Sequence, residues 1–223
     1  MNSEREVSTS QTIYAYDFNG NQLRTIRNGM IVVQNEYNDK NQLIRTEANG
    51  NVVINTYNGE GLRVAKSANG SLTRYLYEFD KVVLEVVIEP GQADKVNRNL
   101  YGTNLLMRTV DNESYYYMYN GHADVTALIN TTTGVVAATY YYDAFGNILE
   151  QTGNVNNNIT YAGYQWDKET GLYYLNARMY DPKIARFLQE DTYRGDPNDP
   201  LSLNLYSYCA NNRVPNKALK TCW

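Results

Sequence analysis

The chain has 223 residues, a formal net charge of −4, and 22 tyrosines against 4 phenylalanines and 2 tryptophans. The acidic balance and the lack of a basic stripe argue against direct nucleic-acid binding, and no apolar run is long enough to span a bilayer. Tyrosine suits strands that are half buried and half wet, and the abundant asparagine suits turns, so the composition favours an all-β protein.

The first feature along the chain is a repeat that starts at a tyrosine. Its consensus is Tyr-(Asp/Asn)-x-x-(Gly/Asn)-x-(Leu/Ile), and the first four copies begin 21, 20 and 20 residues apart. A period of this length holds two strands of about five to seven residues and two turns. The copies begin at Tyr16, Tyr37, Tyr57, Tyr77, Tyr119 and Tyr142.

The turns between these strands carry a specific signal. Asn-Gly allows positive φ at both central residues of a type I′ turn, whose twist matches that of paired strands. Alternating apolar and polar residues at 51–57 and 71–77 flank such turns. The pattern predicts antiparallel hairpins wound into a curved sheet or partial shell; the alternative is an antiparallel sandwich with frequent turns. The dipeptide occurs at Asn19, Asn28, Asn49, Asn58, Asn69 and Asn120.

Two segments interrupt the repeat. Residues 88–94 contain Pro90-Gly91 and are predicted to form a loop between repeat blocks. The polar segment 153–158 is either a long hairpin loop or a domain boundary. Helix is expected to be scarce, limited to a turn or two between Asp181 and Gln189.

The C-terminal part carries the most specific motif. From Tyr161 the chain reads YAGYQWDKETGLYYLNARMYDP, and it continues through Arg186-Phe187 and Glu190-Asp191 to Asn204-Leu205-Tyr206 and Asn211-Asn212. This series closely resembles the RHS-repeat-associated core, whose pattern is D-x-E-T-G-L-Y-Y-x-x-A-R-x-Y-D-P-x-x-G-R-F followed by N-L-Y-x-Y-x-x-N-N. Residues 14–79 resemble the looser YD repeat of the same family.

The resemblance implies a division of the chain into four parts. These are a YD-repeat β region at 1–88, a connecting loop and strand at 89–114, an RHS-repeat-associated core at 115–212, and a divergent, truncated tail at 213–223. In this family YD repeats wind into a β-sheet shell and the core closes one end. A C-terminal toxin is released inside the shell by self-cleavage.

The resemblance therefore predicts a structural shell segment of an RHS-type polymorphic toxin, secreted or at the cell surface as part of a longer parent protein. The expected partners are a C-terminal toxin peptide or the remaining YD-repeat shell of that parent. The first residues lack a signal peptide. The D-P-x-G cleavage segment and the toxin do not follow Asn212, and Ala185 replaces a family glycine that would permit positive φ.

Self-cleavage in the family resembles aspartyl chemistry, in which two carboxyls share one proton. The matching acids are Asp181 and Asp191, with Arg178 or Arg186 to orient them and with Asp196 and Asp199 as weaker alternatives. The competing interpretation is structural: Asp181 caps a turn and neighbouring arginines pair with it. Because the segment to be cut is absent, we favour the structural role. An autoprotease that acts on a peptide supplied in trans is a further hypothesis.

The remaining candidates are aromatic or isolated. The tyrosine triplets at 115–117 and 140–142 favour cross-strand ladders; alternatively, exposed rings would bind carbohydrate at the cell surface. His122, the only histidine, follows an Asn-Gly turn and lacks the partners of a triad or a metal site. Cys209 and Cys222 are expected to be free thiols. With no phosphate loop or dinucleotide motif, no cofactor or metal is expected.

Open sheet edges are the last expectation. A shell segment leaves at least one edge strand without a partner, and such strands recruit others. The chain is therefore expected to close on itself, to associate edge to edge, or to aggregate.

Overall fold

The computed structural model describes residues 5–9, 12–48 and 50–209. Fifteen strands form one antiparallel sheet in which the order of strands follows the sequence throughout. This is a meander of hairpins, so the predicted all-β hairpin repeat is confirmed. The strands are β1 (Arg5–Thr9), β2 (Thr12–Tyr16), β3 (Gln22–Arg27), β4 (Met30–Tyr37), β5 (Leu43–Ala48), β6 (Asn51–Tyr57), β7 (Arg63–Ala68), β8 (Ser71–Glu78), β9 (Lys81–Ile88), β10 (Lys95–Tyr101), β11 (Leu105–Val110), β12 (Glu113–Tyr119), β13 (Val125–Asn130), β14 (Val136–Tyr142) and β15 (Ile148–Thr152).

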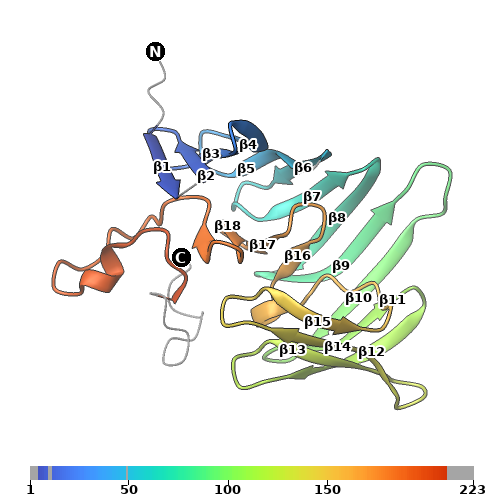
Figure 1. Cartoon of the computed structure of the whole chain (residues 1–223). Coiled ribbons are helices and arrows are strands. Elements are labelled where there is room, and N and C mark those ends of the chain that lie inside the picture. Colours follow the sequence, from blue (N-terminus) through green and yellow to red (C-terminus); the bar gives the residue numbers. More distant parts are fainter. Residues whose placement is uncertain (1–4, 10–11, 49, 210–223) are drawn as a thin grey trace.

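A second sheet lies within the curve of the first. Figure 1 shows the large sheet bending from β1 through β9 to β15, with the small sheet inside the bend. The small sheet has four strands in sequence order: β16 (Gln165–Asp167), β17 (Leu172–Leu175), β18 (Arg178–Asp181) and β19 (Arg186–Phe187). Two 3-10 turns, η1 (Tyr161–Gly163) and η2 (Pro200–Leu203), flank it. We call residues 159–209 the C-terminal block.

The Asp or Asn of each repeat organises a tight loop. The side chain of Asn58 accepts the backbone N–H groups of Glu60 and Leu62 at 3.1 and 2.9 Å, and its own N–H donates to the Leu62 carbonyl at 2.9 Å. Asparagine and aspartate side chains favour such local bonds to the backbone. The same pair of side-chain bonds forms at Asp17, Asn38, Asn120 and Asp143.

In five of the six repeats the tyrosine ties two neighbouring strands together. The Tyr57 hydroxyl at the end of β6 donates to the carbonyl of Leu43, the first residue of β5, at 2.8 Å. A tyrosine is needed because its apolar ring packs on the sheet while its polar tip reaches the backbone. Equivalent bonds of 2.7 to 3.0 Å are made by Tyr37, Tyr77, Tyr119 and Tyr142.

The Asn-Gly turns are of two kinds. Type I′ geometry is confirmed at Asn28-Gly29, with φ of 51° and 77°, and at Asn69-Gly70, with φ of 52° and 80°. The prediction is wrong for Asn19, Asn58 and Asn120, which do not have positive φ. They lie in the loops organised by the repeat Asp or Asn, whose side-chain bonds impose another backbone path. Asn49 lies outside the described residues.

The short helix expected between 181 and 189 is not there. Asp181 ends β18, residues 182–185 form a turn, and Arg186 and Phe187 form β19. Ala185 has a φ of 56° within that turn. The left-handed conformation that glycine would allow is therefore adopted by an alanine, and the hairpin is kept.

The large sheet continues past the first interruption of the repeat and ends before the second. Residues 89–94 form a hairpin loop, after which β10 pairs with β9. Residues 153–158 follow β15 without forming a strand and lead to the C-terminal block. In the described part of the chain, no helix is long and apolar enough to cross a membrane.

Candidate functional site

The C-terminal block has two buried faces. Leu172, Tyr174 and Met179 pack with Leu43 of the large sheet and with Leu188. Tyr173, Leu175, Tyr180 and Phe187 form a separate aromatic core with Tyr161 and Tyr208. Because successive residues of a strand point to opposite faces, β17 is buried on both sides. The block is therefore held inside the curve of the large sheet.

A buried ion network joins the large sheet to this block. Arg63 at the start of β7 contacts Asp167 of β16 at 2.5 Å, and Lys66 reaches the same carboxylate at 3.0 Å. Arg63 is fully buried, and its guanidinium also binds Gln165 at 2.8 Å and Asn55 at 3.2 Å. Burial alone would raise the pKa of Asp167, but the charges of Arg63 and Lys66 outweigh it and hold that pKa below its usual value.

A second buried ion pair lies farther along the sheet. Arg108 of β11 binds Glu85 of β9 at 2.8 and 3.0 Å and the Asn99 side chain at 3.0 Å. Asn158, just before the C-terminal block, donates to Glu85 at 3.2 Å. Burial raises the pKa of Glu85, but Arg108 overrides that effect and lowers it. This pair thus anchors the segment that leads into the block.

Three tyrosines of the C-terminal block donate hydrogen bonds to the backbone of the last repeat loop. The hydroxyls of Tyr161, Tyr173 and Tyr180 donate to the carbonyls of residues 144, 146 and 145 at 2.8, 3.0 and 2.9 Å. Gly146 has a φ of 94°, and a Cβ there would lie 2.6 Å from the Tyr161 ring. Glycine is therefore required both by the backbone and by the approach of the ring.

Two of the four predicted site residues come together. Arg178 binds Asp191 at 2.6 Å and donates to the Leu205 carbonyl at 3.1 Å. Its guanidinium also lies 3.7 Å from the centroid of the Phe187 ring. Arg178 thus fixes the segment that carries Asp191, as a pairing arginine would.

Asp181 lies on the other face of the small sheet. Arg178 and Tyr180 share one face of β18, whereas Met179 and Asp181 share the opposite one. The Asp181 carboxylate accepts the N–H of Lys183 at 2.9 Å, and burial raises its pKa. The structure does not bring Asp181 and Asp191 together, and the bond to Lys183 is the turn-capping role weighed from the sequence.

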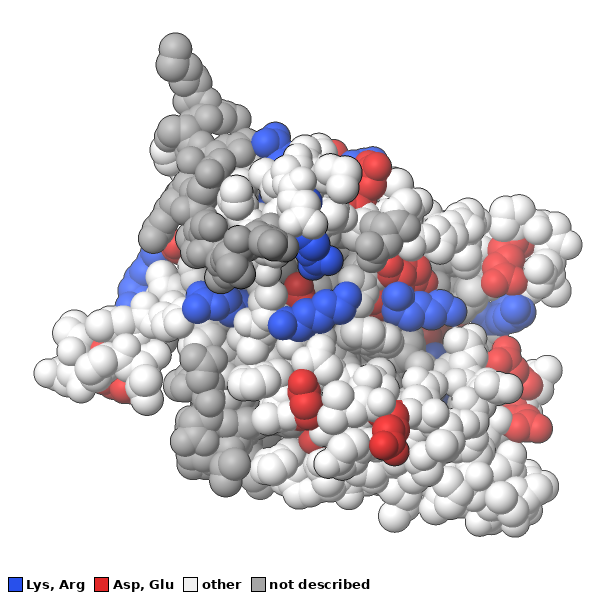
Figure 2. Space-filling view, in the orientation of Figure 1, with Lys and Arg blue, Asp and Glu red and all other residues white. Residues whose placement is uncertain are grey.

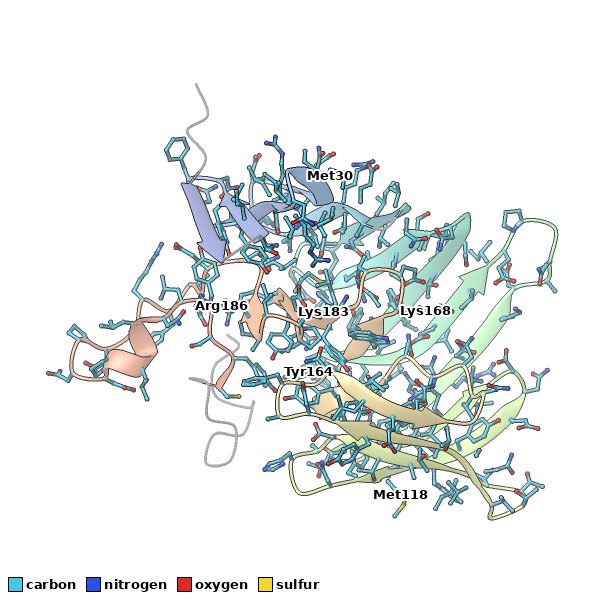
Figure 3. All side chains as sticks on the ribbon, viewed as in Figure 1. Met30, Met118, Tyr164, Lys168, Lys183 and Arg186 are labelled. Carbon is cyan, nitrogen blue, oxygen red and sulfur yellow. The ribbon has the colours of Figure 1, made fainter. Side chains whose placement is uncertain are left out.

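Arg186 is exposed. It is the cross-strand partner of Asp181, but no ion pair joins it to either acid within the described ranges. Figure 3 shows Arg186, Lys183 and Lys168 in a row on the C-terminal block, and Figure 2 shows basic side chains across the middle of the same face. The open side of the block is therefore basic, although the chain as a whole is acidic.

Asp196, Asp199 and His122 take up turn positions. Asp196 accepts the N–H of Asn198 at 2.9 Å, and Asp199 caps η2 by accepting the N–H of Leu201 at 3.2 Å. His122 is exposed in the loop organised by Asn120. The described residues hold no cluster of His, Cys, Asp and Glu that suits a metal ion. Cys209 is buried, and Cys222 lies outside the described residues.

The tyrosine triplets alternate as strand geometry requires. Tyr115, Tyr117 and Tyr140 are buried, whereas the middle residues Tyr116 and Tyr141 are 51 and 63% exposed. The Tyr117 hydroxyl donates to the Asn157 side chain at 2.6 Å. Most of these rings belong to the core, and one tyrosine of each triplet is left on the outer surface.

The ion network was missed by sequence reasoning. Its charged residues occupy inward positions of strands, where the alternating pattern predicts apolar side chains. Glu85 interrupts the apolar run 82–88, and that interruption was the available signal for a buried charge. The sequence identifies Asp167 only as the first residue of the D-x-E-T-G part of the C-terminal motif.

Relatives of the chain include nucleases of bacilli. The tRNA3(Ser)-specific nuclease WapA of Bacillus spizizenii is 41% identical over 163 residues, and the tRNA nuclease WapA of Bacillus subtilis is 39% identical over the same length. Each match covers 70% of this chain and 7% of the relative. Salivary gland surface protein 1 of Aedes aegypti is 34% identical over 117 residues, which is 48% of this chain and 3% of that protein. The chain thus spans a small part of each relative.

Solved structures share the fold. The crystal structure of TcdB2-TccC3 matches with a TM-score of 0.72 and 21% identity, over 89% of this chain and 11% of that one. The Photorhabdus luminescens Tc holotoxin pore with the TccC3-D651A mutation matches with a TM-score of 0.72 and 19% identity, over 93% of this chain and 11% of that one.

The sequence model of the Teneurin YD-shell family matches residues 2–214, which is nearly the whole chain. The resemblance to YD-repeat and RHS proteins is confirmed, and the chain belongs to the teneurin YD-shell family.

Proposed function

We propose that this chain is a segment of a β-sheet shell that encloses a polypeptide, as part of an RHS-type toxin. The observation that carries the proposal is the C-terminal block seated inside the curved meander and joined to it by the Arg63–Asp167 network. Such an arrangement gives the sheet an inner surface and closes part of it. The likeness to TcdB2-TccC3 supports the shell fold.

A chimera tests the proposal. This chain would replace the matching stretch of the Bacillus subtilis tRNA nuclease WapA, with a site for a specific protease inserted on its C-terminal side. A shell segment should leave that site resistant to added protease until the protein is unfolded. The matched control carries Asp167→Leu, which breaks the ion network, and should expose the site. Equal cleavage of the native-like chimera and of an unfolded sample would contradict the shell.

The autoprotease hypothesis has a separate test. The family's D-P-x-G segment would be fused after Asn212, and cleavage followed by mass spectrometry. We expect no cleavage, because Asp191 pairs with Arg178, whereas Asp181 lies on the opposite face of β18 from that arginine. If the fusion is cut and Asp181→Asn or Asp191→Asn stops the reaction, the two acids are catalytic and the structural interpretation is wrong.

The carbohydrate hypothesis depends on the exposed tyrosines. Burial leaves Tyr116 and Tyr141 as the rings of the two triplets that a sugar could reach. Binding to a glycan array or to cell walls that disappears in the Tyr116→Ala/Tyr141→Ala variant would favour it. We propose instead that the triplets are structural, and expect no signal in either protein.

A further inference from the structure

Two asparagines on the concave face, Asn55 and Asn99, each accept a hydrogen bond from an arginine. Asn55 of β6 lies across the strands from Lys66, and Asn99 of β10 lies across from Arg108. The Asn55 oxygen accepts from Arg63 at 3.2 Å, and the Asn99 oxygen accepts from Arg108 at 3.0 Å. Each cation is balanced by a buried carboxylate, Asp167 or Glu85. The repeated unit is therefore an asparagine oxygen, a guanidinium and a carboxylate.

Asn35 of β4 has the same position in its repeat but a different partner. It lies two residues before Tyr37, and its amide N–H donates to the Gln22 carbonyl at 2.8 Å, as the Asn55 amide does to Leu43 at 3.0 Å. Across the strands from it stands Thr46 in place of a lysine or arginine. The chain therefore supplies no cation opposite this asparagine.

Three buried oxygens result at this position. Asn35 Oδ1, Gln22 Oε1 and Thr46 Oγ1 have no hydrogen-bond partner among the described residues. The three residues are only 3, 2 and 1% exposed. A buried acceptor without a donor costs about 1–3 kcal/mol, so a donor that reached these oxygens would be stabilised.

The same three side chains line a cavity of about 160 Å³ between the large sheet and the C-terminal block. Asp181 of β18 lines it from the other side, and one of its oxygens already accepts the N–H of Lys183. Arg27 and Lys183, both exposed, border the cavity. We call it the Asn35 cavity.

The donor that fits these acceptors is a guanidinium. It offers five N–H groups in a planar fork and carries the charge that a carboxylate balances. The volume admits such a group, since a single water takes up about 30 Å³ in the liquid. Arg63 and Arg108 place this group against the Asn55 and Asn99 oxygens, although Arg108 lies opposite its asparagine and Arg63 lies opposite Tyr57.

We propose that the Asn35 cavity binds a guanidinium group from outside the chain, with Asp181 as its counter-charge and Gln22, Asn35 and Thr46 as acceptors. The group comes either from a small molecule or from an arginine side chain of a polypeptide. The site is defined within this chain and does not depend on the shell function. Its affinity for an isolated guanidinium is expected to be millimolar, because the ligand is small and two exposed cations border the cavity.

The test is an NMR titration of the full chain with methylguanidinium. Saturable shifts are expected at the side-chain amides of Gln22 and Asn35. Methylurea, which has nearly the same shape but no charge, is the matched ligand and should bind much more weakly. Asp181→Asn should weaken methylguanidinium binding by about tenfold or more, because it removes the counter-charge. Arg27→Gln should tighten binding, because it removes a competing charge at the mouth.

A second set of variants changes Thr46, the residue that lies across the strands from Asn35. Thr46→Lys supplies the cation from the chain, as Lys66 does opposite Asn55, and should abolish binding. Thr46→Val has the size of threonine and removes one acceptor, so it should weaken binding only a few-fold. If Thr46→Lys does not fold, Asp181→Asn and Thr46→Val still decide the question.

Two blocked amino acids identify the source of the guanidinium group. N-acetyl-arginine-amide is compared with its citrulline counterpart. Binding of the arginine compound as well as methylguanidinium assigns the site to a polypeptide side chain; binding of methylguanidinium alone assigns it to a small molecule. The proposal is overturned if no saturable shifts appear, if methylurea or citrulline binds equally well, or if Asp181→Asn leaves the affinity unchanged.

Discussion

At the residue scale, Asp167 is the carboxylate shared by the fully buried Arg63 and by Lys66, which also pairs with Glu169. Asp167→Asn leaves Arg63 and Lys66 without their shared counter-charge, and breaking a buried pair in this way costs about 3–5 kcal/mol. Urea unfolding followed by circular dichroism should show that loss. Asp39→Asn, at an exposed aspartate in a repeat loop, should change stability little. Similar midpoints for the two variants would mean that the network is not needed for folding.

The same residue predicts a pH dependence. The pKa of Asp167 is lower in the folded state than its ordinary value of 3.8. A carboxyl with a lowered folded pKa contributes stability that is fully present above the unfolded pKa and is lost as the pH falls through the folded one. The wild type should therefore lose stability below about pH 4, and the double variant Arg63→Met/Asp167→Leu should lose less over that range. Parallel curves for the two proteins would assign the acid sensitivity elsewhere.

Ala185 offers a gain in stability. Its φ of 56° is a left-handed conformation, which costs an L-residue roughly 1–2 kcal/mol. Ala185→Gly removes that cost but adds about 0.5–1 kcal/mol of unfolded-state entropy, so we expect a net stabilisation of up to ~1 kcal/mol. Ala65→Gly, within β7, should destabilise instead. A lower melting temperature for Ala185→Gly would contradict the assignment of the turn.

At the scale of elements, the repeat tyrosine acts through its hydroxyl. Tyr57→Phe keeps the ring but removes the bond to the Leu43 carbonyl, which should cost about 0.5–1.5 kcal/mol. Tyr116→Phe, on the exposed face of β12, should cost almost nothing. Denaturant midpoints of the two variants check this. Equal effects would show that the ring alone explains why tyrosine recurs.

The hairpins could be predicted from sequence because their signals are local. The tyrosine period and Asn28-Gly29 each specify a turn within a few residues. Asn58-Gly59 wrongly suggests a type I′ turn. Asn58 follows the repeat tyrosine, and its side chain accepts backbone N–H groups that fix the backbone of a longer loop. A dipeptide therefore predicts a turn correctly where it alone determines the backbone conformation, and incorrectly where a side chain binds the backbone of the turn.

The candidate site could be predicted only in part, because its geometry is not local. The sequence suggested Arg178 or Arg186 as the partner of both acids, whereas Arg178 contacts Asp191 and Asp181 lies on the opposite face of β18. Residues 178 and 181 lie on opposite faces because β18 extends to Asp181, and the sequence pattern does not specify where that strand ends. The pairing of Arg63 with Asp167 spans 104 residues, and no spacing rule reports it.

At the scale of the whole molecule, the large sheet has two edges. Among the residues that the structure describes, β1 and β15 each pair on one side only, and an uncovered edge strand recruits others. We expect concentration-dependent association in sedimentation velocity. Leu149→Lys, on the edge strand β15, should reduce it, whereas Leu76→Lys, equally exposed but on the interior strand β8, should not. A monomer at all concentrations, or equal effects of both lysines, would rule out association through the β15 edge.

The strictly sequential strand order has a consequence for synthesis on the ribosome. Each hairpin of the meander can form as soon as it emerges, because its partner strand has just been made. Arg63 and Lys66 are then in place while Asp167, about a hundred residues later, has not been translated. Their inward-facing charges stay hydrated until the C-terminal block arrives. The nascent chain is thus prevented from closing early, and the C-terminal block, which is translated after the meander, completes the interior.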